Sequence, residues 1–316
     1  MSFDRYTRSP LSYTDGVPSF IETDYYYREV DRYTMLNVIS LAKSLGWRRV
    51  TTGIENIVVK RYISDPIRTL FLELVRISPN QRVLDLGAGW GSLSMQISKR
   101  YPGVEVYAFD KTIEGLLFLN LVREQEKLPN LHIARADASD IPMEKESFDV
   151  AFIIGVLEWV GASMKNMSPL DAQLKVLNEV KRLLKKGGRA VIGIENRFSY
   201  QYLKGKRDHS GMKFASVLPK SLTNLYMKAR FNEEYRTYIY SYSGYRKLFL
   251  ERAGFSNVET YVTDPNYRFP KAISDPGSVR EMMISSHKKR DWKWIRLLPD
   301  SVLRAVAPSF YFIVEK

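Results

Sequence analysis

The stretch "VLDLGAGWGSL" (residues 83–93) decides the fold of this 316-residue chain. Its first half is apolar except for one aspartate, as expected of a buried strand, and three closely spaced glycines follow. Glycine in that place lets the chain turn with positive φ and brings backbone N–H groups close to a ligand at a helix N-terminus. The stretch therefore predicts a strand, a tight turn and a helix that form a ligand site.

Short apolar runs recur through the middle third of the chain and alternate with amphipathic stretches. The predicted strands cover residues 82–87, 104–110, 131–137, 148–155 and 189–196. The clearest predicted helix is "LDAQLKVLNEVKRLLKKGG" (170–188), whose apolar residues recur at helical intervals before two closing glycines. Repeated strand–helix–strand units predict a mostly parallel α/β sheet with helices on both faces, whose ligands bind beyond the carboxyl ends of the strands.

The composition bounds the chemistry and the cellular setting. The chain has no cysteine, which excludes disulfides, thiolate metal sites and cysteine nucleophiles and favours a cytoplasmic protein. We find no signal-peptide pattern at the N-terminus and no run of eighteen uncharged apolar residues, so we expect a soluble protein that can still lie on a membrane surface.

Positive charge is concentrated toward the C-terminus. The net charge is +13, and residues 197–316 contain 22 Lys and Arg against 11 Asp and Glu, an excess of +11. Such a bias attracts nucleic acid, acidic lipid headgroups or phosphorylated substrates. A basic solvated face without one dedicated partner would give the same bias.

The two ends of the chain are less regular than the middle. Residues 1–20 predict an irregular arm, residues 22–46 a helix that stops at a glycine, and Asp65-Pro66 the start of a second helix. Residues 243–255 predict a helix, 257–263 a strand and 309–316 a final edge strand. The segment 265–308 is too long for a loop and must be a structured insertion. We expect an N-terminal lid or cap at 1–62, a cofactor-binding core at 63–197 and an acceptor-binding region at 198–316.

Acidic residues lie at or near the ends of the first three predicted strands of the sheet. The glycine spacing departs from the dinucleotide pattern G-x-G-x-x-G, because Ser92 holds the place of the third glycine. Asp85 precedes the first glycine, where it would repel a pyrophosphate and attract a cationic amino acid. Asp110, nineteen residues after Gly91, can bind both ribose hydroxyls, and Asp137 with the next backbone N–H can bind an adenine edge. Each acid could instead cap a helix.

Residues 65–196 resemble a class I S-adenosylmethionine-dependent methyltransferase. The glycine motif, the acid that ends the second strand, the aspartate after the third strand and "FDVAFIIGVLEWV" (148–160) carry the resemblance. It implies a Rossmann-like methyltransferase sheet and S-adenosylmethionine as the cofactor. The residues that it assigns to the cofactor are Asp85, Gly87, Ala88, Gly89, Gly91, Asp110, Lys111, Asp137, Ala138 and Gly155. It says nothing about the acceptor.

The loop after the fifth strand, in "GIENRFSYQYLKGKRDHSG" (193–211), supplies candidates for acceptor chemistry. Methyl transfer from a sulfonium to a hydroxyl needs an aligned nucleophile and a group that removes a proton. His209 is the predicted base and Asp208 the carboxylate that orients it, although His209 could instead cap a helix or bind a carbonyl. Glu158, after the fourth strand, is a second candidate base or a structural acid.

Three motifs resemble a subgroup of bacterial and archaeal methyltransferases associated with surface-polysaccharide and lipopolysaccharide biosynthesis. They are "GVLEWVG" (155–161), "IENRFSYQYLKGKRDHSG" (194–211) and "DPNYRFP" (264–270), and the match spans residues 63–272. The subgroup has acids where this chain has Arg207 and Asn266, and a tyrosine where it has Trp159. Asn196, Arg197 and Tyr267 are the predicted acceptor-binding residues, although the first two could simply pin the loop. No metal is expected.

The acceptor and partners follow from this resemblance and from the C-terminal composition. We expect O-methylation of a sugar or a lipid-linked glycan, with peripheral membrane contact through the basic and aromatic segment 285–312. The main competing function is an RNA methyltransferase, but the chain lacks an N/D-P-P-Y/F motif, cysteines and a recognisable RNA-binding module. The chain could also methylate another small anionic or lipid acceptor, or be a non-catalytic relative that keeps the fold.

Overall fold

The glycine-rich stretch folds as predicted in the computed structural model, which describes residues 5–26, 30–286 and 293–316. Strand β3 (Arg82–Leu86) leads through the glycines into helix α4 (Ser92–Arg100). Gly87, Gly89 and Gly91 all have positive φ, and a Cβ on Gly91 would clash with Leu119. Glycine is therefore required at this turn by both the backbone and the packing.

The chain forms two units, the first made of Met1–Phe152 with Glu179–Arg189 and the second of Ile153–Asn178 with Ala190–Lys316. The strand order in the first unit is β1-β2-β5-β4-β3-β6. These strands are β1 (Ser12–Thr14), β2 (Val17–Ser19), β3, β4 (Glu105–Asp110), β5 (Leu131–Arg135) and β6 (Phe148–Ile154), the last of which runs on into the second unit. Strand β3 is parallel to β4 and β6, and β4 is parallel to β5, as predicted.

The N-terminal region differs from the prediction of an irregular arm. Strands β1 and β2 form an antiparallel hairpin, and β2 joins the sheet beside β5, where Phe20 N–H donates to the Arg135 carbonyl at 2.9 Å. Helix α1 (Arg32–Leu45) starts ten residues later than predicted, because the Asp31 side chain accepts from Thr34 N–H and caps it there. Its predicted stop at Gly46 is confirmed.

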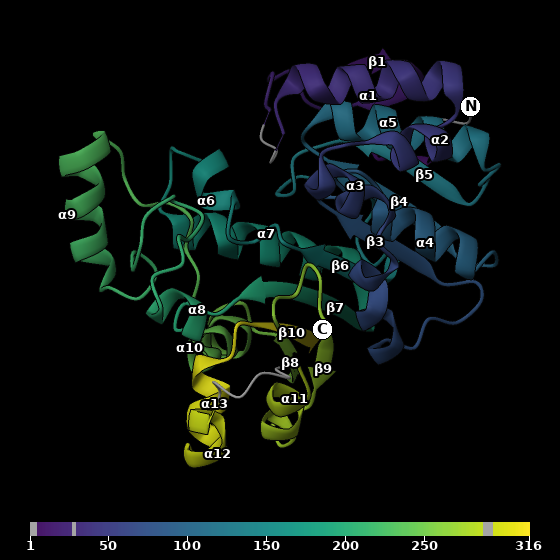
Figure 1. Cartoon of the computed structure of the whole chain (residues 1–316). Helices are drawn as coiled ribbons and strands as arrows, with labels where there is room; N and C mark the ends of the chain where they lie inside the picture. Colours follow the sequence, from purple (N-terminus) through teal and green to yellow (C-terminus); the bar gives the residue numbers. More distant parts are fainter. Residues whose placement is uncertain (1–4, 27–29, 287–292) are drawn as a thin grey trace. The chain divides into compact units, whose positions relative to one another are not determined.

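Helices pack on the sheet of the first unit. They are α1, α2 (Trp47–Gly53), α3 (Ile57–Ser64), the 3₁₀ helix η2 (Pro66–Leu74), α4 and α5 (Ile113–Gln125). Figure 1 shows α1 alongside α5. The predicted start of a helix at Asp65-Pro66 is confirmed, since Asp65 accepts from Ile67 N–H, although the helix is 3₁₀ rather than α.

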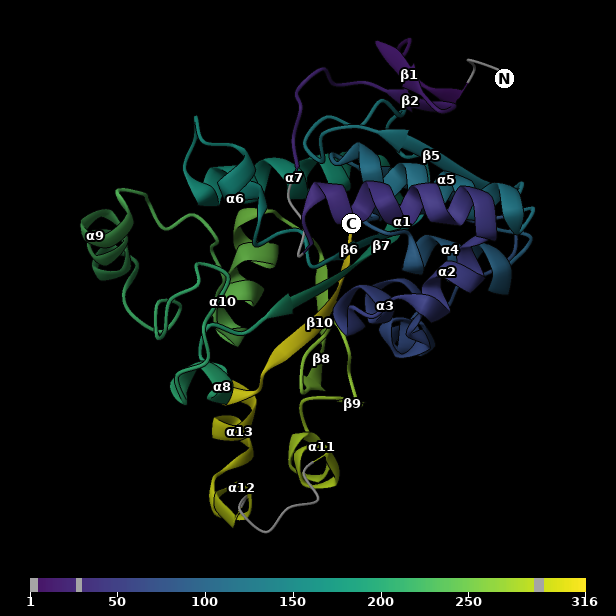
Figure 2. The same ribbon diagram turned by 45° about the horizontal axis from the view of Figure 1, so that its top comes forward.

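The second unit has the strand order β7-β10-β8-β9. These are β7 (Leu184–Glu195), which begins in the first unit, β10 (Ser309–Glu315), β8 (Asn257–Asp264) and β9 (Ala272–Ser274). The prediction that 309–316 is an edge strand is wrong, because β10 lies between β7 and β8 (Figure 2). Six of its seven residues are buried without alternation, as expected of a strand covered on both faces.

Helices and short turns complete the second unit. They are α6 (Val160–Ser163), α7 (Pro169–Leu183), which ends in the first unit, α8 (Tyr200–Leu203), α9 (Lys220–Phe231), α10 (Tyr242–Lys247) with the π-helical turn η3 (Leu248–Arg252), α11 (Val279–Ser286), α12 (Lys293–Leu297) and α13 (Asp300–Val306). The segment 265–308 therefore has structure of its own, as predicted. Among the described residues, every helix is too short or too polar to cross a membrane.

Candidate functional site

Parallel strands of the first unit bring the predicted cofactor residues to one edge of the sheet. The residues at or just beyond the carboxyl ends of β3, β4 and β5 are Asp85, Gly87, Ala88, Gly89, Gly91, Asp110, Lys111, Asp137 and Ala138. Asp85 is buried and accepts a hydrogen bond from the Ser94 hydroxyl at 2.5 Å. Burial, with a contribution from the Asp110 charge, raises the pKa of Asp85 to about 6.

Asp110 ties the glycine turn to the start of helix α5. One carboxylate oxygen accepts from Gly89 N–H at 2.8 Å, and the other accepts from Thr112 N–H at 2.7 Å. The N-cap residue of α5 is Thr112 and not Asp110, so the helix-capping role that the sequence left open is not the one observed.

Asp137 and Lys111 form an ion pair of 2.9 Å at the same edge. The other oxygen of Asp137 accepts from the backbone N–H and the hydroxyl of Ser139. Burial raises the pKa of Asp137, but the Ser139 hydrogen bonds and the Lys111 charge outweigh it, so the pKa is lowered. Asp137 is thus a fixed carboxylate, and Ala138 follows it in the same turn.

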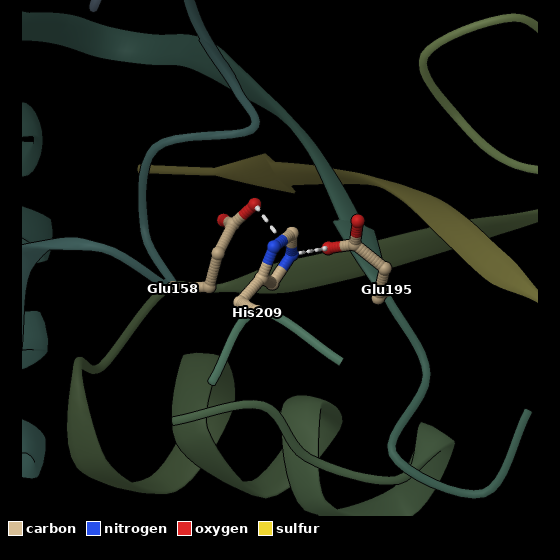
Figure 3. A group of neighbouring side chains, drawn as sticks. All are labelled: Glu158, Glu195 and His209. Atoms are coloured by element: carbon tan, nitrogen blue, oxygen red, sulfur yellow. Dashed lines mark ion pairs between the residues drawn. The ribbon is translucent and has the colours of Figure 1, made fainter. Parts of the chain in front are cut away.

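The second unit gathers three titratable side chains from distant parts of the sequence. Glu158 follows β6, Glu195 ends β7, and His209 lies in the loop after α8 (Figure 3). His209 Nε2 is 3.1 Å from Glu195 Oε2 and 3.8 Å from Glu158 Oε1. Glu158 is fully buried, and the side chains of Glu195 and His209 are 12% and 14% exposed.

Burial and mutual charge set the protonation of this cluster, which we call the Glu–Glu–His cluster. Burial and the Glu195 charge raise the pKa of Glu158 to about 7. Burial would also raise the pKa of Glu195, but the nearby charge of His209 lowers it. Burial lowers the pKa of His209, yet the two carboxylates outweigh burial and raise it. Near neutral pH the cluster can therefore exchange protons.

Neighbouring side chains hold the cluster in place. The Tyr267 hydroxyl donates to Glu158 Oε1 at 3.0 Å and accepts from Arg268 Nε at 2.9 Å. The guanidinium of Arg268 also lies near Glu195, with 3.8 Å between Arg268 Nη2 and Glu195 Oε1. The Trp159 ring packs on His209 with ring centroids 4.5 Å apart. Tyr267, a predicted acceptor-binding residue, thus contacts a predicted base.

Three polar atoms of the cluster have no hydrogen-bond partner within the described part of the chain. They are Glu158 Oε2, Glu195 Oε2 and His209 Nε2. The 3.1 Å approach of His209 to Glu195 brings the two atoms close without hydrogen-bonding alignment. Buried polar atoms normally find partners, so this arrangement is typical of a site that receives a ligand.

The prediction that Asp208 orients His209 is wrong. The Asp208 carboxylate accepts from the backbone N–H and hydroxyl of Ser210 and from the Tyr235 hydroxyl, at 2.5 to 3.2 Å. It braces the loop, and Glu195 is the carboxylate that faces the imidazole. Sequence reasoning missed Glu195, although its place at the carboxyl end of a predicted strand was a signal that could have identified it.

Asn196 and Arg197 pin the loop that follows β7. The Asn196 amide donates to the carbonyls of Ala305 and Ala307 at 2.7 and 2.8 Å. The Arg197 guanidinium donates to three carbonyls of residues 216–218. These bonds match the structural role that the sequence left open.

Gly155, the remaining predicted cofactor residue, belongs to the second unit. It has a φ of 72°, and its N–H donates to the Gly193 carbonyl at 2.9 Å. A Cβ at this position would lie 2.5 Å from the Tyr267 hydroxyl. Glycine therefore lets Tyr267 approach the backbone closely enough to reach Glu158.

Comparisons with known proteins agree with this architecture. Residues 77–226 match a family model described as a methyltransferase domain. The chain also resembles the phosphoethanolamine N-methyltransferase 2 of Haemonchus contortus in complex with S-adenosyl-L-methionine, with a TM-score of 0.50, 16% identity, and coverage of 88% of this chain and 59% of that one. At such identity the likeness shows the fold.

Three curated relatives are also methyltransferases. The demethylmenaquinone methyltransferase of Beutenbergia cavernae is 29% identical over 163 residues, which are 51% of this chain and 52% of that protein. The sterol 4-C-methyltransferase strm-1 of Caenorhabditis elegans is 30% identical over 124 residues, 38% of this chain and 33% of that protein. The ubiquinone/menaquinone biosynthesis C-methyltransferase UbiE of Vibrio campbellii is 31% identical over 118 residues, 36% of this chain and 41% of that protein.

The chain thus spans about half or less of the length of these curated relatives. Its mostly parallel sheet, its glycine turn and the solved structure it resembles define a Rossmann-like class I methyltransferase fold, and residues 77–226 match the methyltransferase domain model.

Proposed function

We propose that the chain is an S-adenosylmethionine-dependent methyltransferase that methylates a hydroxyl oxygen of a sugar or lipid-linked glycan. The observation that carries the proposal is the buried Glu–Glu–His cluster, which follows β6 and β7 in a protein with a methyltransferase domain. The glycine turn and the acids beyond β3, β4 and β5 are the proposed cofactor site in the first unit.

The proposed reaction is an in-line displacement. The acceptor oxygen attacks the methyl carbon, the sulfonium–methyl bond breaks, and the sulfur leaves as the neutral thioether of S-adenosylhomocysteine. The acceptor hydroxyl loses its proton to the Glu–Glu–His cluster. Groups with pKa values near neutrality suit this task, and such proton transfer accelerates reactions by about 10²–10⁴-fold.

Chemistry at the first unit supports a sulfonium cofactor. Asp85 and Asp110 are carboxylates close to the glycine turn, and they favour a cationic amino acid and a ribose over a pyrophosphate. Lys111 holds Asp137 in a fixed position, where its carboxylate can accept from an adenine amine.

The names of the curated relatives favour a second candidate, C-methylation of a quinone or sterol type of lipid. A phenol-like ring also loses a proton when it is methylated at carbon, so the same cluster would serve. Exposed apolar side chains on α9, including Leu222 and Leu225 at 52% and 68% exposure, suit a lipid acceptor.

Membrane contact through residues 285–312 is part of the proposal. Residues 287–292 of this segment lie outside the described residues. Beyond them Leu297 is 82% exposed next to the exposed Arg296. An apolar side chain beside a cation suits a headgroup interface, and the excess of positive charge in residues 197–316 would favour anionic lipid.

Mass spectrometry can test the proposed function and distinguish its acceptors. Purified protein with S-adenosylmethionine is offered nucleotide sugars, lipid-linked glycans, demethylated quinols or RNA, and products are examined for the gain of one methyl group. We expect methylation at oxygen of a sugar or lipid-linked glycan. Methylation at carbon of a quinol would support the second candidate, and methylation of RNA alone would refute both.

A variant of the cluster tests its role in methyl transfer. His209→Gln is expected to slow methylation by about 10²-fold or more while leaving S-adenosylhomocysteine affinity unchanged, since the imidazole acts on the acceptor. Equal turnover in the variant would remove the cluster from the mechanism.

A further inference from the structure

The three side chains of the Glu–Glu–His cluster converge inside the second unit, and each has one polar atom without a hydrogen-bond partner among the described residues. One ligand atom from each of Glu158, Glu195 and His209 lies within 4.8 Å of the other two, and Figure 3 shows the side chains converging. Glu158 is fully buried, and one of its oxygens has no hydrogen-bond donor among the described residues. A cation at this place would offset the cost of burying the Glu158 carboxylate in its ionised form.

A proton on His209 does not satisfy the whole arrangement. A hydrogen on Nε2 can point along only one line, and neither nearby carboxylate oxygen is aligned to accept it. It would also leave Glu158 Oε2 without a donor. The Arg268 guanidinium contacts the Tyr267 hydroxyl and the Glu195 carboxylate, and it does not donate to Glu158 Oε2. A cation placed among the three side chains would bind one ligand atom of each at once.

The distances fit coordination after a small adjustment. Ligand atoms about 2.0–2.2 Å from a common metal ion lie about 3 to 3.5 Å from one another. The measured separations from His209 Nε2 are 3.1 Å to Glu195 Oε2 and 3.8 Å to Glu158 Oε1, and one ligand atom from each residue lies within 4.8 Å of the other two. We infer that Glu158, Glu195 and His209 form a binding site for one divalent transition-metal ion.

The donor set indicates which ions fit. One imidazole nitrogen with two carboxylates suits Mn²⁺, Fe²⁺ or Zn²⁺, whereas Ca²⁺ and Mg²⁺ favour all-oxygen sites. The Tyr267 hydroxyl holds the Glu158 carboxylate at 3.0 Å, and the Trp159 ring packs on the imidazole. Such outer contacts orient ligands in metal sites. Three protein ligands leave coordination positions open to an acceptor.

The binding of the ion does not depend on the proposed methyl transfer, but its role does. An acceptor hydroxyl coordinated to the ion would lose its proton more easily, because a bound cation lowers the pKa of a coordinated oxygen. With the ion bound, His209 would act as a ligand, and the acceptor proton would pass to the solvent in place of the direct transfer to the cluster proposed above. The sequence alone leads to the opposite expectation, that the chain binds no metal.

Manganese binding to the full chain tests the site without any reaction. Protein freed of metal by dialysis against EDTA is titrated with Mn²⁺, and the free ion is followed by electron paramagnetic resonance. We expect one bound ion per chain and a loss of affinity of at least about tenfold in Glu195→Gln and in His209→Gln. A parallel calorimetric titration with Zn²⁺ should show the same order of affinities.

Glu105→Gln is the matched control. Glu105 and His132 form another carboxylate–imidazole pair, in the first unit, and the Glu105 side chain is 49% exposed. This variant should bind Mn²⁺ like the wild-type protein. Circular dichroism and S-adenosylhomocysteine affinity establish that each variant is folded, so a loss of ion binding cannot result from unfolding.

The outcomes separate this inference from the proposed function. Absence of Mn²⁺ and Zn²⁺ binding, or affinity that survives both cluster variants, would overturn the metal site while leaving methyl transfer open. If the protein binds the ion and the cluster variants do not, the metal site is supported, even when none of the acceptors tested becomes methylated. Full methylation by metal-free protein would also overturn the inferred role.

Discussion

Replacing Asp110 by alanine should weaken S-adenosylhomocysteine binding and destabilise the first unit. The carboxylate accepts from Gly89 and Thr112 N–H groups at 2.8 and 2.7 Å. Hydrogen bonds to a charged group contribute about 1.5–3 kcal/mol each, so we expect a loss of about 3 kcal/mol or more in the free energy of unfolding. Loss of one ribose contact of about 1.4 kcal/mol would weaken binding by about tenfold, and disorder of the turn would add to this.

Isothermal titration calorimetry measures the affinity, and urea denaturation measures the stability. Asp149→Ala is the control, because Asp149 also accepts from a backbone N–H, that of Arg82 at 2.8 Å, and from Lys185. It lies at the start of β6, away from the carboxyl ends of the strands. The control should lose stability and keep its affinity. Unchanged affinity in Asp110→Ala, or equal losses in both variants, would refute the proposed cofactor site.

Three further predictions concern Asp85, the glycine turn and the loop that carries His209. Burial raises the pKa of Asp85 from 3.8 to about 6, so ionisation of Asp85 disfavours the folded state. The free energy of unfolding of the wild-type protein should therefore fall relative to that of Asp85→Asn as the pH rises from about 4 to 6. Urea denaturation that shows the same pH dependence of stability in both proteins would contradict this. Gly91→Ala, with a φ of 76° and a clash with Leu119, should lower the free energy of unfolding by about 1–3 kcal/mol, whereas Gly53→Ala, with open space around it, should not. Asp208→Asn should slow methylation by loosening the loop and leave S-adenosylhomocysteine affinity intact, and equal rates would show that the brace is dispensable.

Local signals in the sequence predicted the core of the fold well. The five strands of the middle region were located to within a few residues, except that β7 begins at Leu184, before the closing glycines. The glycine turn was predictable because positive φ and close packing leave few options besides glycine. The strands and the glycine turn are determined by residues close together in the chain, so a single sequence is enough to predict them.

Features set by long-range pairing were harder to predict. The hairpin β1–β2 joins the sheet beside β5, and β10 inserts between β7 and β8, through contacts with residues far away in sequence. The β10 sequence "SFYFIVE" is nearly continuously apolar, which could have indicated an interior strand. The default assumption that a terminal strand lies at an edge was the error.

The candidate site shows the same division. The sequence predicts Glu158, after the fourth strand, and His209, in the loop after the fifth strand, as candidate bases, and the structure brings the two side chains together. It paired His209 with its neighbour Asp208, but the loop turns the Asp208 carboxylate toward Ser210 and Tyr235. The carboxylate that faces His209 comes from Glu195 instead. Side-chain direction in an irregular loop depends on tertiary contacts that no local pattern encodes.

A crystal structure of the protein with S-adenosylhomocysteine tests the central claim most directly. We expect electron density for the ligand at the glycine turn after β3, with the ribose hydroxyls on Asp110 and the amino group near Asp85. A ligand bound elsewhere, or a turn that stays empty at saturating S-adenosylhomocysteine, would contradict the proposed cofactor site.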